Sequence, residues 1–118
     1  MEVEDYLVNL MPHELVLEIE GRRYIVDYVE GVAVRVSYDL EEIFKIGNKI
    51  PVYREVPGSA VVKGLPDPEP GRYFVTSAMV ARAAQRPDVF SPNTHPKYVK
   101  RTRRAGPIES VCGLVSYI

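Results

Sequence analysis

Four polar residues have the side chains that acid–base or phosphate chemistry requires: His13, Ser77, Arg86 and Asp88. A histidine can act as a general base or donate to a phosphate when a carboxylate or hydroxyl lies nearby. Ser77 falls at a predicted strand–helix junction, the position of a hydrolase nucleophile, but the flanking glycines of a nucleophile elbow are missing. If one end of a sheet gathers these residues, the chain is an enzyme or a binder of a phosphorylated small molecule. If they scatter, that hypothesis fails.

Each of these residues also has a structural interpretation, which we favour. His13 lies at the entrance to the first predicted strand, where a ring nitrogen can fix a turn. Ser77, or the threonine before it, can cap a helix by accepting a hydrogen bond from an N–H of the first turn. Arg86 and Asp88 flank Pro87, so we expect them to partner the loop after the helix and satisfy its last carbonyls. We therefore assign no catalytic residue.

Potential metal ligands are scarce in this sequence. His13, His95 and Cys112 show no pair at the spacing of a zinc site, so we expect neither a metal nor another cofactor. Cys112 is the only cysteine and has no partner for an intrachain disulfide. It lies between Val111 and Gly113, and we expect it to be a small buried apolar residue.

A basic run, KYVKRTRR, covers residues 97–104 and carries five positive charges in eight residues. They belong to Lys97, Lys100, Arg101, Arg103 and Arg104. An extended strand here would have charge on both faces, which indicates a solvated edge hairpin whose charges prevent edge-to-edge pairing. The alternative is a nucleic-acid-binding arm that tracks phosphates. A pI near 6.1 and a single aromatic residue in the run make it the weaker interpretation.

Composition sets the broad class of the chain. Its 118 residues, 46% hydrophobic and 26% charged, suit one soluble domain with its own core. No window reaches the roughly 18 apolar residues of a membrane helix, and the acidic N-terminus lacks a secretory apolar segment, so we expect a cytoplasmic protein. Ten prolines, ten arginines and few Asn, Gln or Cys predict a thermophilic source.

Charge is distributed unevenly along the chain. Residues 1–58 hold twelve acids and six bases, a net charge of −6, whereas residues 59–118 hold four acids and nine bases, a net charge of +5. This asymmetry predicts either a face for an anionic partner or two halves that attract each other within one fold.

The elements that must position these residues are mostly strands, because hydrophobicity repeats with period two. We expect strands over residues 14–20 and 24–29 joined by a turn at 21–23, then strands over 32–38, 51–56, 59–63 and 72–75. Residues 39–48 fit either a helical turn capped by Asp39 or a strand. Residues 64–71 form an extended proline-rich loop. One helix is predicted at about 77–86, followed by a loop over 87–96 and a closing hairpin of 98–104 with 108–117.

About seven short strands and one helix indicate a mostly β (α+β) fold, a compact β-barrel or sandwich, in a single domain over residues 1–118. We expect one buried core, made of Leu15, Leu17, Ile19, Val34, Phe74, Val75 and Val80.

Several short sequence motifs, each occurring once, follow one another along the chain in a characteristic order. They are NLMPH at 9–13, LPDPEPG at 65–71 before the strand-like YFVTS at 73–77, Arg86 with Asp88, and the Gly-rich end with Gly106 and Cys112 to Leu114. Together they resemble a family of small uncharacterised proteins encoded by phages, prophages and archaeal viruses. The resemblance implies a viral or prophage origin and no particular reaction. With the heat-adapted composition, it suggests a virus of a thermophilic archaeon.

Our leading hypothesis is a small viral accessory protein in the host cytoplasm that works by binding rather than catalysis. We expect it to be a homo-oligomer or to bind a protein partner, with no cofactor and no membrane contact. The alternatives are the phosphorylated-ligand hypothesis for His13, Ser77, Arg86 and Asp88, and nucleic-acid binding through residues 97–104.

Overall fold

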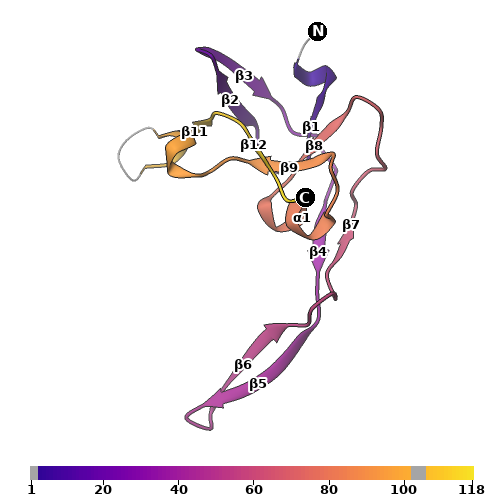
Figure 1. Cartoon of the computed structure of the whole chain (residues 1–118), viewed down its shortest axis with the longest axis vertical. Helices are drawn as coiled ribbons and strands as arrows, with labels where there is room; N and C mark the ends of the chain where they lie inside the picture. Colours follow the sequence, from indigo (N-terminus) through magenta and orange to yellow (C-terminus); the bar gives the residue numbers. More distant parts are fainter. Residues whose placement is uncertain (1–2, 102–105) are drawn as a thin grey trace.

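The computed structural model of the chain describes residues 3–101 and 106–118. The described part is mostly β, with one α-helix (Figure 1). The elements in chain order are η1 (Val3–Asp5), β1 (Leu7–Asn9), β2 (Leu15–Ile19), β3 (Arg22–Val26), β4 (Arg35–Ser37), β5 (Leu40–Ile46), β6 (Ile50–Glu55), β7 (Val61–Lys63), β8 (Tyr73–Val75), α1 (Ala78–Ala84), β9 (Val89–Pro92), η2 (Pro96–Tyr98), β10 (Val99–Arg101), β11 (Ile108–Val111) and β12 (Leu114–Ser116).

Two four-stranded sheets form the body of the protein. One has the strand order β1-β8-β9-β12 and the other β10-β11-β2-β3. A buried cluster draws on both sheets, with Leu15, Leu17 and Val111 from the second and Val75 from the first. The arrangement is therefore sandwich-like. None of the sheets in the described part of the chain closes on itself, so the barrel alternative is wrong.

The β2–β3 hairpin follows from the alternation of its residues. Leu15 and Leu17 are buried, which confirms the predicted face of the first strand, but Ile19 is 37% exposed and was wrongly placed in the core. The turn is one residue tighter than predicted, because Glu20 and Gly21 both have positive φ, of 51° and 78°. Two such residues make the type of turn whose twist matches that of a hairpin. The return strand therefore already begins at Arg22.

Helix α1 has the predicted place and cap. The Ser77 hydroxyl accepts a hydrogen bond from the Val80 N–H at 3.3 Å. The helix ends where Gln85 takes a left-handed conformation, and the Gln85 side chain donates to the carbonyl oxygens of Arg82 and Tyr117 at 2.8 and 3.1 Å. Gln85 thus satisfies a last-turn carbonyl, a role that we had expected of the charged residues after it.

A second buried cluster lies beneath this helix and is formed by Leu10, Phe74, Ala81 and Val89. The expected single core is therefore two clusters. Five of the seven predicted core residues are buried, Val34 packs half-buried against the second cluster, and Ile19 is the exception.

Asn9, at the end of β1, is fully buried. Its amide nitrogen donates to the carbonyl oxygens of His13 and Val26 at 2.9 and 3.0 Å, and its side-chain oxygen accepts from the Met11 N–H at 2.9 Å. One side chain thus joins β1, the end of β3 and the loop that leads into β2.

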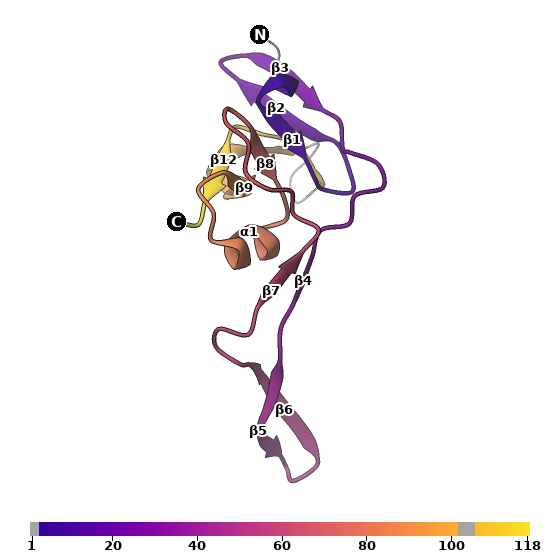
Figure 2. The same cartoon turned by 90° about the vertical axis from the view of Figure 1, so that its right-hand side faces the viewer.

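The largest departure from the predicted compact shape is an arm formed by residues 35–63, which extends away from the body (Figures 1 and 2). Strands β4 and β7 pair near the body, and β5 and β6 pair farther out. The principal extents of the molecule are 57 × 39 × 27 Å. Gly64, with φ of 87°, closes the arm where it meets the body, since a Cβ there would lie 2.3 Å from the Ala33 carbonyl oxygen.

Residues 39–48 form strand β5 and its turn, so the helical alternative for this segment is wrong. Gly47 and Asn48 both have positive φ and make a tight hairpin turn into β6. The register of β5 on β6 shifts between Glu42 and Phe44, which leaves Ile43 as the extra residue of a bulge.

Three further strand predictions need correction. Of the strand predicted over 32–38, only β4, Arg35–Ser37, forms. The predicted loop over 87–96 contains β9, Val89–Pro92, which pairs with both β8 and β12. The predicted closing hairpin is correct only where β10 pairs with β11. After Cys112 the chain passes to the other sheet, where β12 pairs with β9.

Candidate functional site

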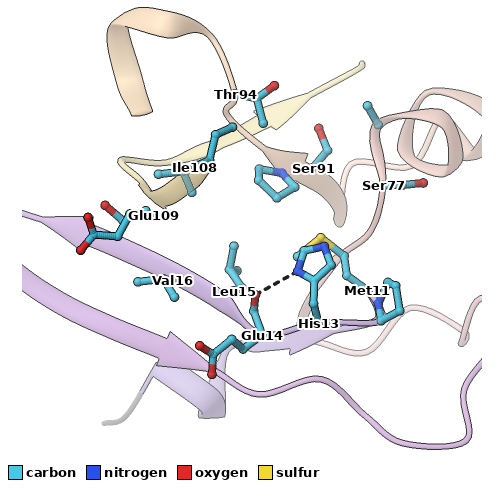
Figure 3. Close-up of a pocket in the computed structure, with 15 residues that line it drawn as sticks. Met11, His13, Glu14, Leu15, Val16, Ser77, Ser91, Thr94, Ile108 and Glu109 are labelled. Atoms are coloured by element: carbon cyan, nitrogen blue, oxygen red, sulfur yellow. Dashed lines mark hydrogen bonds between the residues drawn. The ribbon is translucent and has the colours of Figure 1, made fainter. Parts of the chain in front are cut away.

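His13 and Ser77 line the same pocket, whose volume is about 520 Å³ (Figure 3). The pocket lies between β2, β9 and β11, and its walls also include Ser91, Thr94 and Glu109. Arg86 and Asp88 are not among the residues that line it. The structure thus brings together two of the four residues proposed for phosphate chemistry and separates the other two.

The polar groups of this pocket are largely committed to partners within the fold. The Ser77 hydroxyl is the helix cap, and the Ser91 hydroxyl lies 2.8 Å from that of Tyr117. The His13 Nδ1–H donates to the Glu14 carbonyl oxygen at 3.0 Å (Figure 3). Among the contacts of the described residues, no hydrogen bond joins His13 to Ser77. A nucleophile needs a base within hydrogen-bond reach, so this arrangement lacks the contact on which acyl or phosphoryl transfer would depend.

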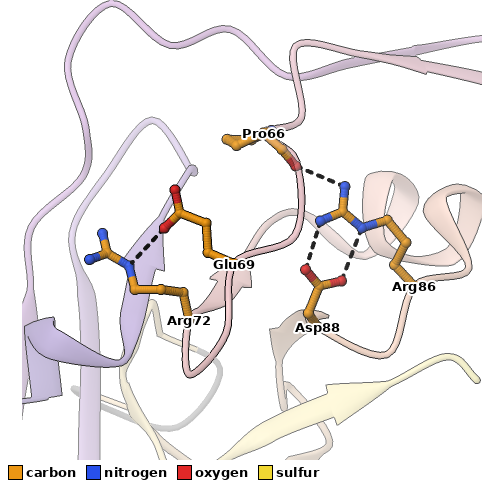
Figure 4. Close-up of polar contacts among 5 residues, drawn as sticks. All are labelled: Pro66, Glu69, Arg72, Arg86 and Asp88. Atoms are coloured by element: carbon orange, nitrogen blue, oxygen red, sulfur yellow. Dashed lines mark hydrogen bonds and ion pairs between the residues drawn. The ribbon is translucent and has the colours of Figure 1, made fainter.

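Arg86 and Asp88 form a clamp between the loop after α1 and the proline-rich loop (Figure 4). The guanidinium makes two hydrogen bonds to the carboxylate, at 2.9 and 2.7 Å, and a third to the Pro66 carbonyl oxygen at 2.8 Å. It also lies over the Phe74 ring, 5.8 Å from the centroid. The predicted structural partnership of the two residues is therefore seen, with a loop carbonyl in place of the helix carbonyls that we expected.

The clamp shifts the ionisation of both partners. Hydrogen bonding to Arg86, followed by its positive charge, lowers the pKa of Asp88 against the opposing effect of burial. The pKa of Arg86 is raised, chiefly by the hydrogen bonds to Asp88. Both side chains are more than three-quarters buried, at 23% and 15% exposure, so solvent screens this pair less than a surface pair.

Asp88→Asn is expected to lower the free energy of unfolding at pH 7 by about 1–3 kcal/mol, because a charge-assisted bidentate pair is lost. A carboxylate whose folded pKa is lowered contributes fully above its unfolded value, near 3.8, and loses its contribution as the pH falls through the lower folded value. The difference between wild type and variant should therefore shrink below about pH 4. Urea unfolding at pH 7 and pH 3 measures it.

A double-mutant cycle with Arg86→Gln isolates the coupling of the clamp. The matched control is the Arg23–Glu109 pair, at 2.8 Å but with side chains 45% and 33% exposed, where we expect a smaller coupling. A difference between wild type and Asp88→Asn that stays the same at pH 3 as at pH 7 would contradict the assignment.

The described part of the basic run also has partners within the chain. Lys100 lies 3.9 Å from the Glu18 carboxylate, and Arg101 donates to the Gly106 carbonyl oxygen at 2.7 Å. The Lys97 ammonium lies 5.7 Å from the centroid of the Tyr98 ring. Arg103 and Arg104 lie outside the described residues. Strand β10 is an outer strand of its sheet, as an edge hairpin requires.

Cys112 is exposed, which corrects the expectation that it is buried. It lies in the short bend between β11 and β12, where the chain leaves one sheet for the other. Among the residues described, no group of three or more His, Cys, Asp or Glu side chains could hold a metal ion. None of the described helices is long and apolar enough to cross a membrane.

Sequence reasoning missed the arm as a candidate site. Eight large hydrophobic side chains between residues 38 and 61 are exposed: Tyr38, Leu40, Ile43, Phe44, Ile46, Ile50, Tyr53 and Val61. Soluble proteins rarely expose contiguous apolar surface without a function for it. The signal in the sequence was the density of Ile, Phe, Val and Tyr around Gly47-Asn48, none of which we had placed in the predicted core.

No protein-family model, no curated protein and no solved structure matches the chain.

Proposed function

We propose that this protein is a non-enzymatic interaction module that binds another protein through its arm, residues 35–63. The observation that carries the proposal is the exposure of apolar side chains on an element that lies outside both core clusters. An isolated two-stranded hairpin is only marginally stable in water. A partner protein that buried the apolar side chains of the arm would therefore stabilise it.

A protein surface suits the arm better than a polyanion does. Residues 35–63 carry five basic and four acidic side chains, so the arm has almost no net charge. Phosphate-tracking surfaces are strongly basic. Aromatic and aliphatic side chains, by contrast, dominate the buried centres of protein interfaces. The alternative hypothesis of nucleic-acid binding concerns residues 97–104 and not the arm.

The enzyme alternative receives less support from the geometry. It required His13, Ser77 and Asp88 in one cleft, and Asp88 is bound to Arg86 outside the pocket. The biological setting that we propose is that of a viral accessory protein in the cytoplasm of a thermophilic archaeal host. Its support is the resemblance of several short phrases to those of phage and archaeal-virus proteins, together with a composition poor in heat-labile residues.

Site-specific photo-cross-linking tests the proposal. The photoreactive analogue p-benzoyl-phenylalanine at position 44 is expected to form cross-links to protein when cells that make the chain are irradiated. Phe44 is 54% exposed at the outer part of the arm. The matched control is the same analogue at Met79, which is 58% exposed on the body. We expect cross-linked bands from position 44 and not from position 79.

Equal yields from both positions, or no protein cross-link from position 44, would overturn the proposal. Circular dichroism of each purified variant checks that the body is folded, because neither position belongs to a buried cluster.

A further inference from the structure

We infer that the pocket beside His13 takes up an extended segment of another polypeptide, which pairs with β2 as an additional strand. This inference goes beyond the proposed function, because none of the described residues that line the pocket belongs to the arm. It depends on three features of the body: an opening in the second sheet, backbone groups of β2 that face this opening, and an apolar floor.

The second sheet opens between its two inner strands. In the described chain, β11 and β2 run parallel and pair only at Val111 and Leu17. Before this pair, the register of β11 on β10 shifts and leaves Glu109 as the extra residue of a bulge, which bends the strand. The pocket of about 520 Å³ lies here, since residues 13–16 line one side of it and residues 108–110 the other. The sheet therefore has space between two of its strands.

The backbone of β2 presents hydrogen-bonding groups to this opening. The two-residue turn of the β2–β3 hairpin makes Ile19 and Arg22 a hydrogen-bonded pair, and such pairs alternate along an antiparallel ladder. Val16 and Ile25 form a pair of the other kind, so the N–H of Val16 points away from β3 and towards β11. By the same alternation, the carbonyl oxygen of Glu14 also points towards the opening.

The His13 ring occupies the position that a neighbouring strand would take. Its Nδ1–H donates to the Glu14 carbonyl oxygen at 3.0 Å, within the pocket (Figure 3). In a continuous sheet that oxygen would accept an N–H from the next strand. The Glu14 carbonyl and the Val16 N–H flank Leu15, and an acceptor and a donor on either side of one residue are the groups that strand pairing uses.

The floor of the pocket is apolar and belongs to the core. Met11, Leu15 and Val111 line the pocket and are also members of a buried cluster. A residue that pairs opposite Leu15 directs its side chain to the same face of the sheet as Leu15 does. An apolar side chain at that position of an incoming segment would therefore extend the buried cluster.

The side chains of the pocket suit a peptide better than a phosphorylated ligand. None of the described residues that line it is a lysine or an arginine. The Ser110 hydroxyl donates to the Glu18 carboxylate at 3.0 Å, and Glu109 is paired with Arg23 at 2.8 Å. Backbone groups and apolar surface remain. In strand addition, these supply the affinity and the side-chain specificity, respectively.

A phage-displayed library of random seven-residue peptides, selected on the full chain, tests the inference. We expect enriched peptides in which an alanine scan finds one dominant apolar residue. Val16→Pro is expected to raise the Kd of such a peptide at least about tenfold, because it removes the N–H that faces the opening. The matched control is Ile25→Pro, directly opposite on β3, which removes an N–H that points away from the pocket and should leave the Kd unchanged.

His13→Ala is expected to lower the Kd of the same peptide about two- to tenfold, because the incoming strand no longer displaces the ring from the Glu14 carbonyl. A histidine that bound the ligand directly would give the opposite sign. His95→Ala is the control, since the His95 ring accepts a hydrogen bond from the Lys97 N–H outside the pocket. We expect it to leave the Kd unchanged.

Amide hydrogen exchange of the wild-type protein measures the pairing without any substitution. We expect the exchange of the Val16 N–H to slow at least about tenfold when the peptide binds, and that of the Ile25 N–H to stay the same. Circular dichroism checks the fold of both proline variants. If either is unfolded, the exchange of the wild type decides.

Four results would overturn the inference: no enriched peptide, equal binding by wild type and a folded Val16→Pro, unchanged exchange at Val16, or weaker binding by His13→Ala. A peptide that binds equally to wild type and Val16→Pro but is lost in Phe44→Ala would reject the pocket and support the arm. The proposed function would then stand while this inference fell.

Discussion

Asn9→Leu is expected to lower the free energy of unfolding by about 3–5 kcal/mol, since it leaves three backbone groups without their partner. These groups are the carbonyl oxygens of His13 and Val26 and the Met11 N–H. Asn9 itself is 0% exposed, so water cannot replace its amide without opening the structure. Leucine has a similar volume, which limits the effect of a cavity. Urea denaturation followed by circular dichroism measures the change.

Asn93→Leu is the matched control, because the Asn93 side chain accepts a single exposed hydrogen bond, from the His95 N–H at 3.2 Å. We expect its effect to stay below about 1 kcal/mol. If the two variants unfolded at the same urea concentration, the buried network around Asn9 would have no special importance for stability.

Phe74→Ala is expected to cost about 3–5 kcal/mol of unfolding free energy. Phe74 is 2% exposed and belongs to the buried cluster beneath α1, so its removal leaves a cavity that the short helix and β9 must line. It would also remove the ring below the Arg86 guanidinium. Thermal and urea unfolding should both report the loss.

Phe44→Ala is the matched control, because it makes the same substitution at an exposed phenylalanine. Phe44 is exposed on the arm, so we expect almost no change in the unfolding free energy of the purified chain. A comparable loss in both variants would mean that the arm and the body share one core, contrary to the two clusters described above.

The sequence alone predicted those parts of the fold in which local pattern and burial agree. Leu15 and Leu17 alternate with polar residues and face the core, and Ser77 caps the helix that begins at Ala78. Both signals act within a few residues of the chain, so a single sequence suffices to detect them.

Other features depend on contacts between distant residues, and no local pattern encodes them. Strand β9 contains only Val89 and Phe90 as hydrophobic residues before a proline, so its place between β8 and β12 follows from its neighbours. Strand β5 has a bulge at Ile43, which breaks the alternation by which a strand is recognised. The segment therefore fitted a short helix equally well.

The candidate site was likewise predictable only in its local contacts. The proximity of Arg86 and Asp88 follows from the turn at Pro87, whereas their third partner, the Pro66 carbonyl, lies 20 residues earlier in the chain. Large apolar residues are more often buried than exposed, so their presence in a sequence does not by itself indicate an exposed binding surface. The arm exposes such residues, and only the three-dimensional arrangement shows this.

The arm leaves and rejoins the body at one point, where Arg35 pairs with Lys63 and Gly64 contacts the Ala33 carbonyl. The residues between them form an insertion whose two ends lie side by side. Residues added to or removed from both of its strands alter its reach by about 3.3 Å per pair, while the two sheets keep their connections. The distance between the body and a partner bound to the arm is thus set by a length of sequence that can vary independently of the fold.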